Sequence, residues 1–427
     1  MPSRRSRRRR VLAAGAGVLV AVGVAAAVLV LHSPGNVSHP KLSFTAPRTT
    51  PAPARPLPDF QWPFFGYRAD RTRFFAAPAG LRPPLRVRWR FFDGALLEFT
   101  PVMYGNRLFL IDDDGMARAI DARNGHVIWH RKLGTLAASS PALDVPQRLV
   151  VFSLLSLRGK TPGDGAVVAL SMRTGRIRWS HPLPPGSESS PLVADGNVYL
   201  GDQGGDVYSL RASDGRLNWI FHAAGAVKGG IARSHGILYF GDYAGRVYAL
   251  HASNGRPLWD VGTNGAEFGF GSGTFYSTPA VAFGRVYLGN TDGYVYSFAA
   301  RTGQLAWSTG TGAYVYGSPA VADIKGVGPT VYVGSYSGQF YAFDAASGRI
   351  RWTHAAGGKI SGSATVVGNV VYYSDLGTKT TTGLDARTGR VVFSFPDGAF
   401  TPVIADDSTI FLDGYDTLYA LVPRRGR

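Results

Sequence analysis

The stretch VYALHASNGRPLW (residues 247–259) contains the unit that decides this fold. An alternating apolar run leads into a turn at Asn254-Gly255, and Trp259 follows four residues after the glycine. The same glycine-to-aromatic spacing occurs seven times, at Gly125/Trp129, Gly175/Trp179, Gly215/Trp219, Gly255/Trp259, Gly303/Trp307, Gly348/Trp352 and Gly389/Phe393. Successive glycines lie 50, 40, 40, 48, 45 and 41 residues apart. Self-similarity at this period is typical of a radial or stacked array of repeats.

One repeat, SPLVADGNVYLGDQGGDVYSLRASDGRLNWI (residues 190–220), shows how the unit is built. Four short β-rich segments are separated by turns rich in Gly, Asn and Asp, which predicts an antiparallel four-stranded meander. At this period such a meander is a propeller blade with its first strand at the central axis. The recurring tryptophan, on the outermost strand, is expected to pack against a neighbouring blade rather than to contact a ligand.

The first strands of the repeats predict the number of blades. Six open with Ser-Pro or Thr-Pro, at residues 100, 140, 190, 278, 318 and 401, while KGGI (228–231) and SGSA (361–364) occupy the same place without proline. The chain ends after a third strand at 417–421, and RVRWRF (86–91) can supply the missing fourth. Pairing of the two ends would remove exposed sheet edges. We therefore predict an all-β, eight-bladed propeller of four-stranded antiparallel blades.

The N-terminal region is of a different kind. Residues 1–10 hold six arginines, and 11–31 form a run of 21 uncharged residues. At 1.5 Å per residue this run is long enough to cross a hydrocarbon core of about 30 Å, with the arginines on the cytoplasmic side. We expect a single transmembrane signal-anchor in a bacterial cell membrane, with the propeller outside. A cleaved signal peptide or a twin-arginine export signal is the alternative.

The remaining boundaries follow from composition. Residues 32–58 are Pro-rich and lack acidic residues, which predicts an extended tether; 59–422 form the propeller and 423–427 a basic tail. Residues 1–58 hold nine of the 45 basic residues and none of the 28 acidic ones, so the rest carries a net charge of only +8. Such a spread predicts no nucleic-acid binding, which requires a concentrated basic stripe. The absence of cysteine excludes disulfides, covalent haem attachment and cysteine-based zinc sites.

Two stretches, residues 247–259 and FYAFDAASGRIRW (340–352), closely resemble the PQQ-type propeller repeat. That repeat is shared by bacterial quinoprotein dehydrogenases and by the propeller lipoprotein of the outer-membrane assembly complex. WPFFGYRADRTR (62–73) also looks like the stretch that precedes the first blade in such proteins. The resemblance covers residues 59–422 and implies the propeller fold, but many proteins with this repeat bind no quinone.

The dehydrogenase alternative implies PQQ held by Ca²⁺, with an acid as general base. GAEFG (265–269) resembles the loop that supplies the calcium-binding Glu in alcohol-oxidising quinoproteins, which makes Glu267 a weak metal candidate. It lies between two blades, however, whereas the family's loop precedes a third strand. Asp242 does precede a third strand and is the other weak metal candidate, although an Asp there also suits a tight turn. We predict no bound cofactor and no catalytic residues.

Residues just before the first strands are expected to face the central channel. They vary in charge and include aromatics, and the candidates for ligand contact are Glu98, Glu188, Lys228, Tyr276, Tyr316 and Lys359. Variation over a repeated scaffold is where such folds carry specificity, although these side chains could also simply fill a channel. We predict a monomeric, membrane-tethered binding or assembly scaffold whose partner is an envelope protein or cell-wall component. A PQQ-dependent dehydrogenase oxidising alcohols or sugars is the alternative.

Overall fold

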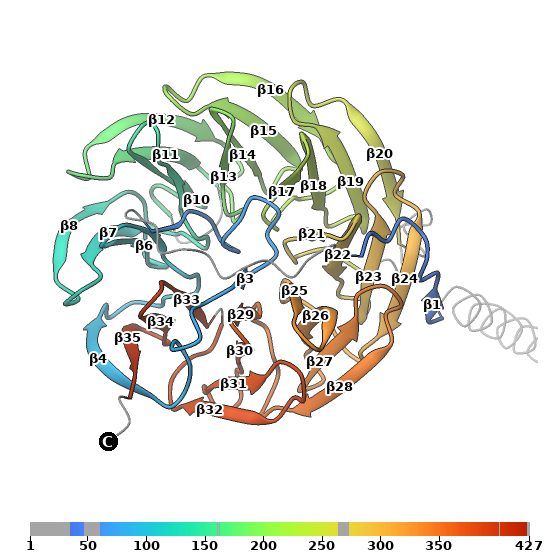
Figure 1. The fold of residues 1–427 in the computed structure, drawn as a ribbon. Coiled ribbons are helices and arrows are strands. Elements are labelled where there is room, and N and C mark those ends of the chain that lie inside the picture. Colours follow the sequence, from blue (N-terminus) through green and yellow to red (C-terminus); the bar gives the residue numbers. More distant parts are fainter. Residues whose placement is uncertain are drawn as a thin grey trace, which may run out of the picture.

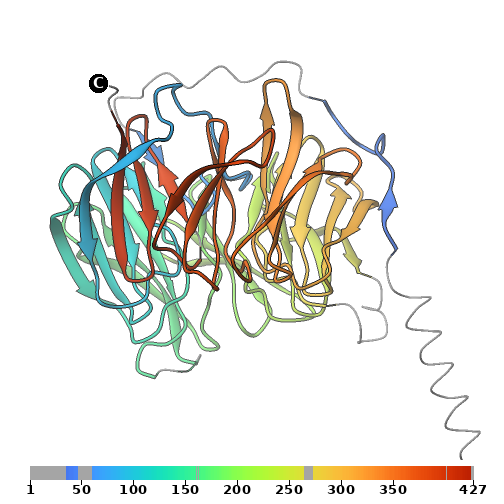
Figure 2. The ribbon, with the colours of Figure 1, turned by 90° about the horizontal axis from the view of Figure 1, so that it is seen from below.

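The computed structural model describes residues 35–46, 60–159, 161, 163–263, 273–400 and 402–424. Over these ranges the chain forms eight antiparallel sheets around a central axis (Figure 1), which confirms the predicted propeller and its number of blades. The regular elements of these ranges are all strands. Seen from the side in Figure 2, the sheets stand next to one another around the ring.

Blades are numbered along the chain, each from its inner strand outward. Blade 1 comprises β5 (Val102–Tyr104), β6 (Arg107–Ile111), β7 (Met116–Asp121) and β8 (Val127–Lys132), and blade 2 comprises β9 (Ala142–Asp144), β10 (Leu149–Leu154), β11 (Gly165–Ser171) and β12 (Ile177–Leu183). Blade 3 comprises β13 (Leu192–Ala194), β14 (Asn197–Gly201), β15 (Asp206–Arg211) and β16 (Leu217–His222), and blade 4 comprises β17 (Ala232–Ser234), β18 (Ile237–Gly241), β19 (Arg246–His251) and β20 (Pro257–Gly262). Blade 5 comprises β21 (Ala280–Ala282), β22 (Arg285–Gly289), β23 (Tyr294–Ala299) and β24 (Leu305–Gly310), and blade 6 comprises β25 (Ala320–Ile324), β26 (Gly328–Gly334), β27 (Gln339–Asp344) and β28 (Ile350–Ala355). Blade 7 comprises β29 (Thr365–Val367), β30 (Val370–Ser374), β31 (Thr381–Asp385) and β32 (Val391–Phe395), and blade 8 comprises β33 (Val403–Ala405), β34 (Ile410–Asp413), β35 (Thr417–Pro423) and β4 (Leu85–Phe92).

Blade 8 is built from both ends of the propeller sequence. β4 pairs antiparallel with β35, with Trp89 opposite Ala420, so the predicted closure of the ring is confirmed. The same irregularity of register occurs between the third and fourth strands of all eight blades, including this one. A β-bulge increases the local twist of a strand, which suits an outer strand that curves around the blade.

The recurring glycine and tryptophan pack across blade interfaces. The indole of Trp179 in blade 2 covers Gly215 in blade 3, and its Nε1 donates to the Ala212 carbonyl at 2.8 Å. A Cβ on Gly215 would lie 2.5 Å from Cε3 of Trp179, and the φ of Gly215 is +72°. Only glycine meets both conditions without strain. The same arrangement joins Trp89/Gly125, Trp129/Gly175, Trp219/Gly255, Trp259/Gly303, Trp307/Gly348 and Trp352/Gly389.

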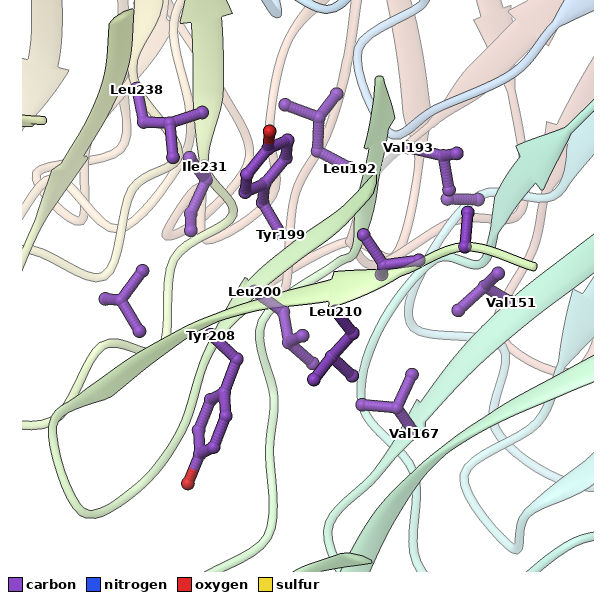
Figure 3. Close-up of a cluster of buried hydrophobic side chains, with 14 of the residues drawn as sticks. Val151, Val167, Leu192, Val193, Tyr199, Leu200, Tyr208, Leu210, Ile231 and Leu238 are labelled. Carbon is purple, nitrogen blue, oxygen red and sulfur yellow. The ribbon is translucent and has the colours of Figure 1, made fainter. Parts of the chain in front are cut away.

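The core lies between the blades rather than in one central cluster. Figure 3 shows side chains of blade 2 (Val151 and Val167) and blade 3 (Leu192, Leu200 and Leu210) in one such cluster. These side chains are fully buried. Alternate residues of each strand therefore face the two neighbouring blades, which explains why the inner strands are apolar on both faces.

The Ser and Thr hydroxyls at the start of the first strands link neighbouring blades at the axis, with or without a following proline. Thr278 Oγ1 accepts from the Gly230 amide at 2.8 Å, Ser318 Oγ from the Thr278 amide at 2.9 Å, and Ser363 Oγ from the Ser318 amide at 2.9 Å. Each hydroxyl thus satisfies a buried amide of the blade before it. This contact gives the repeated Ser/Thr a structural role.

Residues 60–75, which we call the plug segment, cross the middle of the ring near its axis (Figure 1), and Phe65 of this segment lines the axial space. The segment begins with β2 (Gln61–Trp62), which pairs with β5 of blade 1, and ends with β3 (Phe74–Phe75), which pairs with β29 of blade 7. Between them its carbonyls accept from first-strand amides of blades 2, 4, 5, 6 and 7, namely Leu143, Arg233, Val281, Val321 and Val366. One short segment therefore binds nearly the whole ring of inner strands.

Arg71 anchors the plug segment to the starts of blades 3 and 4. Its side chain is fully buried, and its guanidinium donates to the carbonyls of Phe65, Ser190, Pro191 and Ile231 at 2.6 to 3.1 Å. Burial lowers the pKa of Arg71 to about 9. A buried charge is tolerated only where hydrogen bonds replace its hydration, and the ring of carbonyls does so here.

The described part of the Pro-rich segment, residues 35–46, lies along the outside of blade 5. β1 (Val37–Ser38) adds to the outer edge of β24, and the Arg285 guanidinium donates to the carbonyls of His39 and Pro40 at 3.3 Å. The sequence did not predict this contact. Within the described ranges no helix is long and apolar enough to span a membrane; the predicted anchor, 11–31, lies outside them.

Candidate functional site at the axial recess

A recess opens at the end of the axis opposite the plug segment. First strands run from the recess toward the plug: Thr278 lines the recess, and Val281, three residues later, binds the plug segment. The space inside the recess that water-sized groups can occupy is about 40 Å³. Its lining comprises Phe65, Glu98, Phe99, Glu188, Ser190, Lys228, Gly229, Gly230, Tyr276, Thr278, Tyr316, Ser318, Ser361, Gly362, Ser363 and Phe400. We call this the axial recess.

Glu188 is the centre of a hydrogen-bond network that joins blades 3, 4 and 5. Its Oε1 accepts from Lys228 Nζ at 3.1 Å and from Gln203 Nε2 at 2.6 Å, and its Oε2 accepts from the Tyr276 hydroxyl at 2.9 Å. Burial, and then the charges of Glu188 and Glu98, raise the pKa of Tyr276, so the phenol stays protonated and donates. Glu188 is thus a positioned carboxylate with a cation and two donors around it.

Glu98 differs from Glu188 although it lines the same recess. Among the described residues, no hydrogen bond or ion pair engages its carboxyl. Burial, followed by the charges of Asp113 and Glu188, raises the pKa of Glu98 to about 7. The carboxyl can therefore exchange a proton near neutral pH.

Five tyrosines form a row beside the recess, from blade 4 to blade 6. Ring centres are separated by 6.3 Å for Tyr243 and Tyr276, 5.9 Å for Tyr276 and Tyr316, and 4.9 Å for Tyr316 and Tyr336. Tyr314, which is 52% exposed, continues the row 5.9 Å from Tyr316. Such a row offers flat apolar faces with hydroxyls at their edges, a composition typical of binding surfaces.

The structure brings together most of the residues predicted to face the channel. Glu98, Glu188, Lys228, Tyr276 and Tyr316 all line the axial recess. Lys359 is not among the lining residues and lies instead beside the tyrosine row, with Nζ 5.6 Å from the Tyr336 ring centre.

Three side chains of this site were not predicted from the sequence, namely Gln203, Tyr243 and Tyr336. Each lies in the turn between the second and third strand of its blade and follows the Asp or Ser that organises that turn. The signal was present, because this turn position varies between repeats while its neighbours recur. The prediction considered only residues before the first strands.

Asp242, a weak metal candidate, serves its own turn and the adjoining loop. Its carboxylate accepts from the amides of Gly225, Ala244 and Arg246 and from the Tyr248 hydroxyl, at 2.8 to 3.0 Å. The equivalent Asp202 makes a similar set of contacts. Glu267, the other candidate, lies outside the described residues. Among the described residues, no group of three or more His, Cys, Asp or Glu could hold a metal ion.

Comparison with known protein families identifies the family of this chain. The family model described as outer membrane protein assembly factor BamB matches residues 86–261, 203–322 and 292–427, which together span most of the propeller. The chain belongs to this family of PQQ-type propellers. No protein with a curated description matches the chain significantly.

Solved structures with the same fold include a BamB protein and two dehydrogenases. BamB from Moraxella catarrhalis is 17% identical with a TM-score of 0.64, covering 79% of this chain and 99% of its own. A europium-containing methanol dehydrogenase is 13% identical with a TM-score of 0.71, covering 85% and 98%. Quinohemoprotein alcohol dehydrogenase from Comamonas testosteroni is 14% identical with a TM-score of 0.68, covering 86% and 82%. At these identities the likeness shows the fold alone.

The residues of the axial recess do not fit PQQ with Ca²⁺. PQQ is a tricarboxylate, and its binding requires cationic partners. The recess instead presents the carboxyls of Glu98 and Glu188, and the one lysine that lines it is paired with Glu188. Glu98 and Glu188 could serve a Ca²⁺ ion, but among the described lining residues no unpaired cation is left for the carboxylates of PQQ, and about 40 Å³ of space is too small for a three-ring cofactor.

Proposed function

We propose that the protein is a binding or assembly scaffold of the bacterial cell envelope, and that the axial recess with the tyrosine row receives its partner. The observation that carries this proposal is the contrast between the two ends of the axis. The plug segment seals one end with backbone hydrogen bonds, while the other end presents charged and aromatic side chains that differ from blade to blade. A closed channel with a varied mouth suits capture of a partner rather than passage through the ring.

The family supports the same conclusion. Its description names an assembly factor, which is a statement about that protein and not about this chain. The dehydrogenase alternative shares the fold, but no residue set in the axial recess favours it. We therefore propose an envelope protein or cell-wall component as partner, bound by a monomeric propeller without a redox cofactor.

We further propose that residues 11–31 anchor the protein in the cell membrane, with the propeller on the extracytoplasmic side. The motivation is the arginine cluster followed by 21 uncharged residues. Residues 35–46 then lie against blade 5, so the ring would be held close to the membrane by this contact rather than by a long free tether.

Site-specific photo-crosslinking in cells tests the capture of a partner. A photoreactive amino acid replaces Tyr314 in the row, and a matched control replaces Ile177 on the outer strand β12; their side chains are 52% and 51% exposed. We expect adducts from position 314 alone, and we expect Glu188→Ala to reduce them. Equal adducts from both positions, or none from position 314, would count against the recess as the capture site.

Addition of PQQ with Ca²⁺ tests the alternative. We expect neither a change in quinone absorbance nor dye-linked oxidation of alcohols or sugars by the purified protein. Stoichiometric binding of PQQ with turnover would overturn the scaffold proposal and establish the dehydrogenase.

A further inference from the structure

Lys228 shows what kind of group the axial recess holds. Its Nζ lies 3.1 Å from Glu188 Oε1 and 4.8 Å from the centre of the Tyr243 ring. The protein's own alkylammonium is therefore held between a carboxylate and an aromatic face. These are the two features by which proteins recognise organic cations.

The charges of the recess are unequal. Glu188 is fully engaged by Lys228, Gln203 and Tyr276, whereas nothing among the described residues pairs with the carboxyl of Glu98. Asp113 adds a further negative charge close to Glu98, as its effect on that carboxyl shows. Among the described residues that line the recess, Glu98 and Glu188 are the carboxylates and Lys228 is the cation, so one carboxylate is in excess; the nearest other cation on the plug segment, Arg73, is buried against the Phe65 ring, 3.8 Å from its centre. Low exposure strengthens the field of that excess charge.

Aromatic side chains share the lining of the recess with the carboxyl of Glu98. Phe65 forms part of the recess lining from the plug segment, its ring centre 5.5 Å from that of Phe99, and Tyr316 and Phe400 line the remaining wall. A group that enters here meets ring faces on its carbon stem and a carboxylate at its end. This combination suits an amphipathic cation better than a bare metal ion.

We propose that the axial recess binds a primary ammonium group, as carried by a lysine side chain of the partner, with Glu98 as the carboxylate that receives it. The inference rests on the proposed function, because the partner presents the lysine. The recess has about 40 Å³ of space for water-sized groups, so it admits an ammonium group and not a folded element.

The state of Glu98 makes binding depend on pH. The groups that face it are Asp113 from the turn after β6, together with Glu188, Lys228 and Tyr276 around the recess. Since burial and the two carboxylates raise its pKa to about 7, the acceptor is mostly neutral in mild acid and becomes charged above neutrality. Affinity for an ammonium should therefore rise between about pH 6 and about pH 8.

Calorimetric titration of the purified protein with n-butylamine and with Nα-acetyl-lysine amide tests the proposal, with n-butanol as the neutral control. We expect both amines to bind and the alcohol not to bind. Glu98→Gln should weaken amine binding at least about tenfold, because a charged hydrogen bond is lost. Lys228→Met should strengthen it about fivefold, because the competing internal ammonium is removed. Asp214→Asn, which removes an exposed carboxyl from the outer turn of blade 3, should change nothing.

Three results would overturn the proposal. These are equal binding of n-butanol, unchanged amine affinity in Glu98→Gln, or tighter binding of Ca²⁺ than of amines with displacement of the amine. The proposed function is judged separately by the crosslinks from position 314. If those depend on Glu188 while amines do not bind, the scaffold stands and only the chemistry assigned to its ligand is wrong.

Discussion

The indole of Trp89 covers Gly125, with its Nε1 donating to the Ala122 carbonyl at 2.9 Å. Trp89 belongs to the strand that completes blade 8, and Gly125 to blade 1, so this contact lies where the ring closes. It repeats the arrangement found at six other interfaces. The junction between the two ends of the chain is therefore built like the interfaces within it.

The first prediction separates steric contact from backbone strain at these glycines. Gly215 and Gly196 both have positive φ, at +72° and +74°, but only Gly215 lies against a tryptophan. Gly196→Ala should lower the free energy of unfolding by about 1–2 kcal/mol, the cost of a left-handed residue. Gly215→Ala should cost about 1–3 kcal/mol more, because its Cβ collides with Trp179. If urea unfolding gives the same loss of unfolding free energy for both variants, the contact with the indole is not what requires glycine at position 215.

The second prediction concerns the tryptophans themselves. Trp307→Ala should lower the free energy of unfolding by about 3–5 kcal/mol, since this side chain is fully buried between blades 5 and 6. For Trp219→Ala the loss of unfolding free energy should lie at or below the lower end of that range, because this side chain is only partly buried. Chemical denaturation of both variants is the measurement. Native stability combined with loss of partner crosslinks would instead assign the tryptophans to binding.

The third prediction addresses the plug segment. Arg71→Met keeps the approximate volume but removes the donors to four carbonyls, so stability should fall by at least about 2 kcal/mol. Limited proteolysis should then cut within 60–84 before the ring unfolds, because the segment loses its anchor. Arg68→Met, at a neighbouring exposed side chain, is the control and should behave as the wild type. A fully stable, uncleaved Arg71→Met protein would mean that the cost of burying the charge cancels its hydrogen bonds.

The fourth prediction follows from the linkage between proton binding and folding at Glu98. Its pKa is raised to about 7 in the folded protein, so between the ordinary value of 4.5 and 7 the folded state binds more protons than the unfolded state. The contribution of Glu98 to the free energy of unfolding is therefore fully present below about pH 4.5. It falls by roughly 3 kcal/mol at most as the pH rises from about 4.5 through about 7. Melting temperatures of wild type and Glu98→Gln should therefore diverge less at about pH 5 than at about pH 8. A constant difference would contradict the raised pKa.

The fifth prediction concerns topology. A reporter fused after residue 60 should be active only outside the cytoplasm, and mass spectrometry of the membrane-bound protein should recover the N-terminal arginine cluster. The reason is the positive-inside orientation of a retained anchor. Recovery of a soluble form that starts near residue 28 would show that the segment is a cleaved signal.

The architecture could be predicted from the sequence because its signals are local and repeated. A strand, a turn and an aromatic residue four residues after a glycine recur seven times, with tryptophan in six of them and Phe393 in the seventh, and each copy indicates the same local geometry. The eighth interface has no such glycine, because the third and fourth strands of blade 8 come from opposite ends of the chain. Counting both first and last strands was therefore necessary to reach the correct number.

The site was only partly predictable, because its residues come together through closure of the ring. Glu98 and Glu188 are far apart in sequence and face one recess only because both precede inner strands of the same ring. Tyr243 and Tyr336 lie in turns whose sequence indicated only a structural role. The contact of residues 35–46 with blade 5 occurs once in the chain, so no repeated pattern predicted it.

The sequence by itself determined the blades, their number and the closure, since period and alternation are properties of short stretches. Only the tertiary structure decided that Glu188 is paired with a cation, whereas Glu98 has no cation partner among the residues that the structure describes. That distinction depends on distances across blades 3 to 5, and the seal at the opposite end depends on carbonyls of one segment meeting amides of five blades. Such contacts between distant residues carry no local pattern from which they could be read.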